Sequence, residues 1–194
     1  MGKHIRKSTR SKRASYKGAR RYEHWYVDNQ VYFITARVRD QIHAFGSDEA
    51  KQIFWDRFHH WTRHYGFTPW ITSLLSNHYH TLGYLKAGAN LGPLIQRLHG
   101  SVAKLTNDLL PERIARFWLR DGDGKEYFDG CIRSEKQARR TFEYIRTQCR
   151  RHRVCAAPHE YPHTVINVSL ERAVRRAHEI GAFLSGVPYR RLGD

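Results

Sequence analysis

Two groups of side chains in this sequence have the types and spacing that metal-assisted chemistry needs. In the segment Asn77-His78-Tyr79-His80, two histidines are separated by one residue. On a β-strand, residues i and i+2 lie on one face about 6.6–7 Å apart, so both imidazoles can bind one divalent ion while Tyr79 points into the core. The chain contains 13 histidines, so a chance His-x-His pair is the alternative interpretation.

The second group lies on a helix that we expect to begin after Ser134. Its apolar stripe predicts a strongly amphipathic helix, with Tyr144 and Gln148 one turn apart on the flank. A tyrosine in this position is usually a boundary residue. Here the surrounding positive charge lowers the cost of a phenolate and can hold a phosphodiester. The stripe consists of Ala138, Phe142, Ile145 and Cys149, and the cations are Arg139, Arg140, Arg146, Arg150, Arg151 and Arg153.

Other residues with metal-ligating side chains are weaker candidates. His60 and His64 have the i, i+4 spacing of helical ligands, but they lie roughly opposite Phe58 on a helical wheel, so we expect a solvated face. The cysteines Cys131, Cys149 and Cys155 have no Cys-x-x-Cys spacing and cannot all pair. We therefore expect neither a disulfide scaffold nor a zinc ribbon, and we expect a reducing, cytoplasmic environment.

The charge of the chain favours a polyanionic partner. There are 34 Lys and Arg against 18 Asp and Glu, a formal net charge of +16. Nine of the basic residues, including Arg20 and Arg21, lie in residues 1–22, which contain no acid. We expect a disordered arm there, either a solubilising tail or a phosphate-binding segment. No apolar stretch approaches the ~20 residues of a membrane span, so we expect no membrane partner.

The periodicities predict alternating strands and helices. The order favours a ferredoxin-like α+β sandwich, an antiparallel sheet with helices on one face, extended by the basic N-terminal arm and an extra C-terminal helix. The expected strands are 31–38, 70–75 and 78–85, with a hairpin of 117–119 and 126–132 around Asp-Gly-Asp-Gly; the expected helices run from Ser47 to about His64, from Asn90 to before Pro111, from Ser134 onward, and over 170–184.

The two motifs together resemble those of a known family. His78-Tyr79-His80, followed by Tyr144-Ile145-Arg146-Thr147-Gln148, is similar to the motifs of the single-tyrosine HUH transposases of bacterial insertion sequences and their REP-associated relatives, where HUH means His–hydrophobic–His. The resemblance covers about 31–161. The middle residue of the pair is usually aliphatic and is a tyrosine here, and the Asn-Pro that commonly follows the nucleophile in the REP-associated branch is replaced by Gln148-Cys149.

The resemblance implies a function for each motif. Tyr144 would be the nucleophile, and His78, His80 and Gln148 would bind a divalent metal, Mg²⁺ or Mn²⁺. The enzyme would cut and rejoin single-stranded or hairpin DNA through a 5′-phosphotyrosine, in the bacterial cytoplasm and in association with the nucleoid. It would have an RRM-like catalytic domain at 23–167 and a helical extension at 168–194. The arginines expected to bind DNA are Arg139, Arg140, Arg146, Arg150, Arg151, Arg20 and Arg21.

Several points stay open in the sequence. Tyr161 and Tyr127 are reserve candidates for the nucleophile, and Asp129 has no assigned role near the site. Trp25, Tyr26 and Trp118 could stack on bases or pack in the core. The protein could be a monomer or a homodimer. The alternative functions are a non-catalytic protein that binds hairpin DNA or RNA, and a basic ribosome-associated protein with a chance His-x-His.

Overall fold

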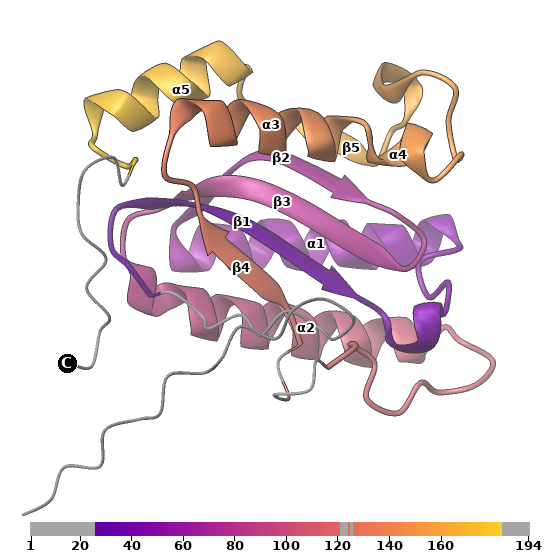
Figure 1. The fold of residues 1–194 in the computed structure, drawn as a ribbon. Helices are drawn as coiled ribbons and strands as arrows, with labels where there is room; N and C mark the ends of the chain where they lie inside the picture. Colours follow the sequence, from indigo (N-terminus) through magenta and orange to yellow (C-terminus); the bar gives the residue numbers. More distant parts are fainter. Residues whose placement is uncertain (1–25, 121–123, 125, 184–194) are drawn as a thin grey trace, which may run out of the picture.

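The computed structural model describes residues 26–120, 124 and 126–183. These residues form a five-stranded antiparallel sheet in the order β4-β1-β3-β2-β5, with β3 at its centre (Figure 1). The first six long elements follow one another as strand, helix, strand, strand, helix and strand, which is the order of a ferredoxin-like sandwich and confirms the expected α+β class. The strands are β1 (Gln30–Arg37), β2 (Phe67–Leu74), β3 (His78–Leu85), β4 (Phe128–Cys131) and β5 (Thr164–Ile166).

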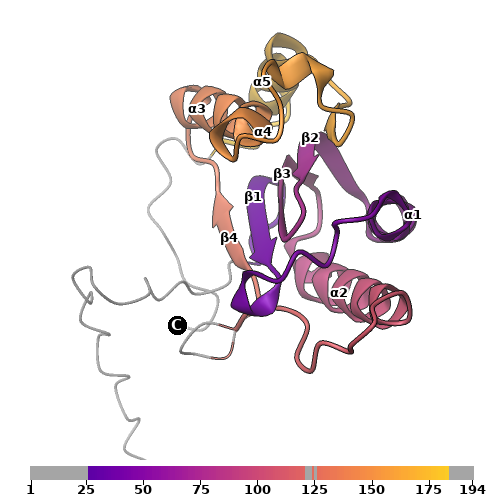
Figure 2. The same ribbon diagram turned by 90° about the vertical axis from the view of Figure 1, so that its right-hand side faces the viewer.

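Helices cover both faces of the sheet, whereas we expected them on one face (Figure 2). The reason is that the central strands are apolar on both sides: Tyr79 packs on one side, and Ile71 and Leu82 pack on the other. The first layer is α1 (Asp48–Tyr65) and α2 (Leu91–Asn107). The second is α3 (Glu135–Arg146), α4 (Gln148–Arg151) and α5 (Leu170–Glu179); short 3₁₀ turns lie at Arg39–Gln41, Gly88–Asn90 and Pro158–Glu160.

The α1/α2 layer anchors the central strand. Tyr79 is fully buried, and its hydroxyl lies 3.0 Å from Nε2 of His99 on α2. The His99 ring in turn stacks on Trp118, with centroids 4.1 Å apart. The tyrosine in the middle of the His-x-His pair therefore ties β3 to α2, a contact that an aliphatic side chain would not make.

Local signals determine where the helices begin and end. Ser47 caps α1 by accepting a hydrogen bond from the Ala50 amide (3.1 Å), and Gly66 ends the helix with φ = 75°. Asn90 precedes α2 but does not cap it. Its Nδ2 instead donates to the Tyr65 carbonyl at 3.0 Å and so joins the end of α1 to the start of α2.

Three other expectations need correction. Trp118 is buried and forms an isolated bridge with Val38, and β4 pairs with β1, so no hairpin between 117–119 and 126–132 is seen in the described part of the chain. The helix that we expected at 170–184 ends earlier, at Glu179, and Gly181 two residues later has φ = 63°. Strand β5, which was not expected, pairs with β2 through only three residue pairs. None of the described helices is long and apolar enough to cross a membrane.

We predict that Gly83→Ala destabilises the sheet. A Cβ at this position would lie 2.5 Å from the Thr68 carbonyl oxygen and 2.6 Å from the Phe67 ring, so the loss should be about 1–3 kcal/mol in the free energy of unfolding. Gly100→Ala on α2 is the matched control. It has no neighbour within 4 Å and should gain up to ~1 kcal/mol. Urea unfolding measures both, and a Gly83→Ala variant as stable as wild type would contradict this packing.

Candidate active site

The two histidines of the His-x-His pair lie side by side at the start of β3. Both are buried, and their ring centroids are 5.0 Å apart. They occupy the sheet face that α3 covers, whereas Tyr79 points to the α1/α2 side. The strand thus separates the residue that anchors it from the residues that can do chemistry, as the two-residue period predicts.

The nitrogen atoms of this pair are available as ligands. Nδ1 and Nε2 of His80 are both buried and have no hydrogen-bond partner within the described structure. Buried polar atoms are normally satisfied, so this orphaned imidazole indicates a partner that binds there. Nδ1 of His78 lies 2.6 Å from Oδ1 of Asn77. Because an amide oxygen can only accept, Nδ1 carries the proton and the lone pair of Nε2 stays free.

Both imidazoles are kept neutral by their surroundings. Burial lowers the pKa of His78 to about 4, and the nearby charges of His152 and Arg37 act in the same direction. Burial, followed by His78, His152 and Arg37, moves the pKa of His80 well below its ordinary value. Neutral imidazole is the form that ligates a metal, so the site can bind one without first losing protons at neutral pH.

Gln148 reaches the same place from the helical layer. Helix α3 ends at Arg146, Thr147 interrupts the helical path, and Gln148 opens α4. Its side chain is 1% exposed, and Nε2 donates to the Tyr144 carbonyl at 2.8 Å. Gln148 also raises the pKa of both His78 and His80 against the larger effect of burial, so its amide lies against the histidine pair.

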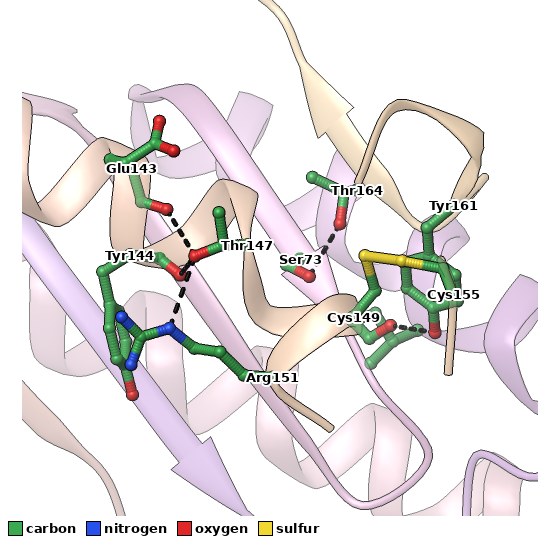
Figure 3. The surroundings of a disulfide bond; sticks show 10 residues. Ser73, Glu143, Tyr144, Thr147, Cys149, Arg151, Cys155, Tyr161 and Thr164 are labelled. Atoms are coloured by element: carbon green, nitrogen blue, oxygen red, sulfur yellow. Dashed lines mark hydrogen bonds between the residues drawn. A yellow bond between two sulfur atoms is a disulfide. The ribbon is translucent and has the colours of Figure 1, made fainter. Parts of the chain in front are cut away.

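Tyr144 lies at the edge of the buried group and remains accessible. Its ring is 36% exposed and packs edge-on against His80 with centroids 5.2 Å apart. The guanidinium carbon of Arg151 lies 5.0 Å from the centre of the ring (Figure 3). Arg151 is oriented by its Nε, which donates to Oγ1 of Thr147 at 3.4 Å. An accessible phenol therefore lies between a metal-competent imidazole and a fixed positive charge.

A hollow of about 750 Å³ opens beside Tyr144. Phe33 of β1 forms part of its lining and contacts both His80 and Tyr144, with centroids 5.9 and 6.1 Å away. An aromatic face among arginines is suited to a nucleotide, because the ring can stack on a base and the guanidinium groups can hold phosphate. The other lining residues are Arg139, Arg140, Thr141, Glu143 and Arg151.

The expected DNA-binding arginines fall into three groups. Arg139, Arg140 and Arg151 line the hollow, although Arg139 also pairs with Glu135 at 2.7 Å. Arg146 is paired with Glu143 at 2.6 Å and does not line it, and Arg150 is exposed on α4. Residues 20 and 21 lie outside the described part of the chain.

Two residues at the site were missed in the sequence, Phe33 and His152, whose exposed ring lies 4.7 Å from that of His78. Asn77 was named with the motif but given no role, and it orients the His78 ring. The spacing in the sequence could have predicted His152, because it lies one helical turn after Gln148. It could also have predicted Phe33, because this residue alternates with the core-facing residues of β1 and so lies on the other face of the strand.

The weaker candidates lie elsewhere. Tyr161 is half-buried, donates to the Leu74 carbonyl at 2.8 Å, and burial raises its pKa to about 12. Burial also raises the pKa of Tyr127, which packs against His99. Asp129 pairs with Ile34 and so faces the α1/α2 side. His60 and His64 are exposed on α1 as expected, and Trp118 belongs to the core rather than to a base-stacking surface.

A disulfide joins Cys149 and Cys155 immediately after Gln148 (Figure 3), where we expected no disulfide scaffold and a reducing environment. The chain turns back after α4, where the Val154 amide donates to the Cys149 carbonyl at 2.8 Å and Arg153 has φ = 58°. This turn brings the two Cα atoms within 5.4 Å. Cys131 is free and buried. The disulfide closes the turn that carries Gln148, Arg151 and His152.

The residues present fit a divalent cation. No cluster of three or more His, Cys, Asp or Glu that could hold a metal occurs in residues 26–120, 124 and 126–183. The available set is instead two neutral imidazoles and one amide. This mixed nitrogen and oxygen set suits Mn²⁺ better than Mg²⁺, which prefers oxygen ligands.

We predict that the metal-free protein loses stability in acid because of these histidines. In the unfolded chain His78 takes up a proton near pH 6.5, but in the folded protein it does so only near pH 4. Stability is therefore full above pH 6.5 and falls as the pH drops towards 4, by on the order of 3 kcal/mol for this group. Urea unfolding in EDTA at pH 7, 5.5 and 4 measures the slope. His78→Asn should flatten it, and an unchanged slope would contradict the burial argument.

We also predict that the disulfide stabilises the fold through its short loop. Cross-linking residues six positions apart should contribute about 2 kcal/mol to the free energy of unfolding. Dithiothreitol should therefore lower the thermal midpoint of wild type. Cys155→Ala, which removes the half-buried partner, should give a protein whose midpoint no longer responds to the reductant. A wild-type midpoint that ignores dithiothreitol would overturn this expectation.

The comparisons with known proteins agree with this architecture. No protein-family model and no curated protein matches the sequence. Among solved structures, the chain is similar to one described as "Structure of the REP associates tyrosine transposase bound to a REP hairpin". The TM-score is 0.63 at 15% sequence identity, and the alignment covers 91% of this chain and 93% of the other. The chain therefore has the fold of that transposase over nearly its whole length.

Proposed function

We propose that this protein is a metal-dependent tyrosine strand transferase that cuts and rejoins single-stranded DNA. The observation that carries the proposal is the contact between Tyr144 and His80. An accessible phenol packs against a buried imidazole whose two ring nitrogens have no partner in the described structure. A merely structural tyrosine at a helix boundary would have no reason to meet an unsatisfied imidazole.

The phenol of Tyr144 acts as the nucleophile. Its oxygen attacks the scissile phosphorus in line, the bond from phosphorus to the 3′ oxygen breaks, and a 5′-phosphotyrosine forms. The departing 3′ oxygen gains a proton and the phenol loses one, so the bonds and charges balance. Because one phosphodiester replaces another, a 3′-hydroxyl can later reverse the step and join strands without an external energy source.

Residues around Tyr144 hold the substrate in position. The Arg139, Arg140 and Arg151 guanidinium groups bind the phosphates on either side of the scissile bond, and Phe33 stacks on a neighbouring base. The substrate must be single-stranded or locally unpaired so that its backbone can bend into the hollow.

The metal would be held by Nε2 of His78, an Nδ1 or Nε2 atom of His80, and the amide oxygen of Gln148. When bound, a divalent ion neutralises charge on the non-bridging oxygens of the phosphate as the transition state forms. Asn77 fixes the tautomer of His78, and the bond from Gln148 to the Tyr144 carbonyl turns the amide oxygen away from the helix.

The fold neighbour is described as bound to a REP hairpin, and we propose hairpin DNA with a single-stranded flank as the substrate here as well. The setting would be bacterial, with the DNA of the nucleoid as target. We assign the catalytic domain to 23–167 and the helical extension to 168–194. The arm at 1–22, with nine basic residues, would add sequence-independent affinity for phosphate.

We predict that Tyr144→Phe abolishes covalent attachment to DNA. The substitution removes only the hydroxyl, so binding of single strands should change less than about twofold, whereas SDS-resistant adducts should fall by at least 10³-fold. Gel electrophoresis of fluorescent oligonucleotides with Mn²⁺ measures the adduct, and anisotropy measures the binding.

Tyr161→Phe is the control for this experiment, because it removes a hydroxyl from the other tyrosine near α4. It should retain the adduct. An adduct that survives Tyr144→Phe and vanishes with Tyr161→Phe would refute the assignment of the nucleophile. If no oligonucleotide gives an adduct with wild type while hairpin binding persists, the protein is a non-catalytic DNA-binding protein on the same fold.

A further inference from the structure

A second and larger hollow lies at the opposite end of the same sheet face. It has a volume of about 1060 Å³ and is bounded by α5 on one side and by Trp70 and Tyr84 below. Helix α5 runs beside α3 over the sheet (Figure 1) and contributes Ala173, Val174 and Ala177 to the core beneath both helices. We call this hollow the α5 groove.

The α5 groove and the catalytic residues share one strand. His80 and Tyr84 lie four residues apart on the same face of β3, about 13 Å between Cα atoms, and Lys86 at the rim lies about 20 Å from His80. These two distances, about 13 and 20 Å, correspond to about four and six base-pair steps of ~3.4 Å each. One short DNA hairpin could therefore reach both places.

The two sides of α5 have different charge. The side facing α3 carries Glu171 and His178, which pair with Arg139 at 3.7 Å and Glu135 at 3.3 Å. The groove side carries Arg172, Arg175 and Arg176, to which Lys86 adds a fourth cation.

Most of this positive charge is free to meet an anion. The one acid in the lining is Glu179, which lies 3.4 Å from Arg176. No carboxylate of the described residues lies within ion-pair distance of Arg172, Arg175 or Lys86. Residues three apart on a helix lie about 5–6 Å from each other at Cβ, so Arg172 and Arg175 form a row along the rim. The groove therefore has a net charge of +3 from its lining.

The lining favours a duplex backbone over unpaired bases. Trp70 is 4% exposed and cannot offer a face for stacking, and the Tyr84 hydroxyl is used in a 2.7 Å bond to Oδ1 of Asn29. The groove thus presents mainly cations, which recognise phosphate. The hollow beside Tyr144 presents two open or partly open rings, Tyr144 and Phe33, whereas the lining of the α5 groove contains one, Tyr84.

We propose that the α5 groove binds the phosphate backbone of the duplex stem of a DNA hairpin whose single-stranded flank enters the Tyr144 site. This proposal rests on the proposed function for the identity of the DNA, but the binding itself needs no chemistry at Tyr144. The α5 groove would select a stem next to a cleavage site without reading its sequence, and the flank alone would occupy the site more weakly.

The test is the double variant Arg172→Ala/Arg175→Ala in the full chain. Two probes are used: a hairpin with a stem of about six base pairs and a single-stranded 5′ flank, and an unstructured oligonucleotide of equal length. Anisotropy at several salt concentrations gives the affinities. The variant should bind the hairpin roughly 10- to 30-fold more weakly at ~0.15 M salt, with a salt slope smaller by ~2. Its affinity for the unstructured probe, and its adduct with that probe, should match wild type.

Two controls separate specific contact from general charge. Arg97→Ala/Lys104→Ala removes two exposed cations from α2 on the other face of the sheet and should leave both probes unaffected. Arg172→Lys/Arg175→Lys keeps the charge and should restore most hairpin binding. A loss no larger than that of the α2 control, or an equal loss for both probes, would overturn the proposal. A selective hairpin loss in a protein that never forms an adduct would support the α5 groove and refute the catalytic function.

Discussion

The alternation of side chains along β3 is the constraint on which the rest of the structure depends. The strand lies between β1 and β2, and both of its faces are covered. One face fixes the strand through Tyr79 and its bond to His99. The other holds His78 and His80 in a buried layer, where burial keeps them neutral and the two His80 nitrogens have no hydrogen-bond partner among the described residues. The same packing that stabilises the sheet thus leaves the His80 imidazole unsatisfied.

The layer formed by α3 and α4 supplies the remaining residues of the candidate site, and here too the burial of one face decides where the other side chains lie. Phe142 and Ile145 bury one face of α3 against the sheet, which leaves Tyr144 at the boundary beside His80. The break at Thr147 then redirects the chain so that Gln148 turns inward and Arg151 turns back over the tyrosine ring. The disulfide from Cys149 closes this short turn, which is too short to be stable as an isolated helix.

Elements with a strongly periodic pattern could be predicted from the sequence, whereas features that depend on contacts between residues far apart in the chain could not. The strand at β3, the cap at Ser47 and the stripe of α3 follow from local spacing, and so does the proximity of Tyr144 to Gln148. The second helical layer depends on how both sheet faces are filled, which one strand pattern cannot reveal. Trp118 was ambiguous because an aromatic residue fits a core and a surface equally well. The pairing of Cys149 with Cys155 depends on a turn at Arg153 that no motif encodes.

The central claim is that Tyr144 is the residue that joins DNA, assisted by the histidine pair beside it. Its most direct test is to incubate the wild-type protein with a single-stranded oligonucleotide and Mn²⁺, digest the DNA and the protein, and locate the residual nucleotide by mass spectrometry. Trypsin should release residues 141–146, bounded by Arg140 and Arg146. We expect the nucleotide mass on Tyr144 of this peptide, and only when the metal is present. A nucleotide on Tyr161 or Tyr127, or an adduct that forms equally well in EDTA, would contradict the account.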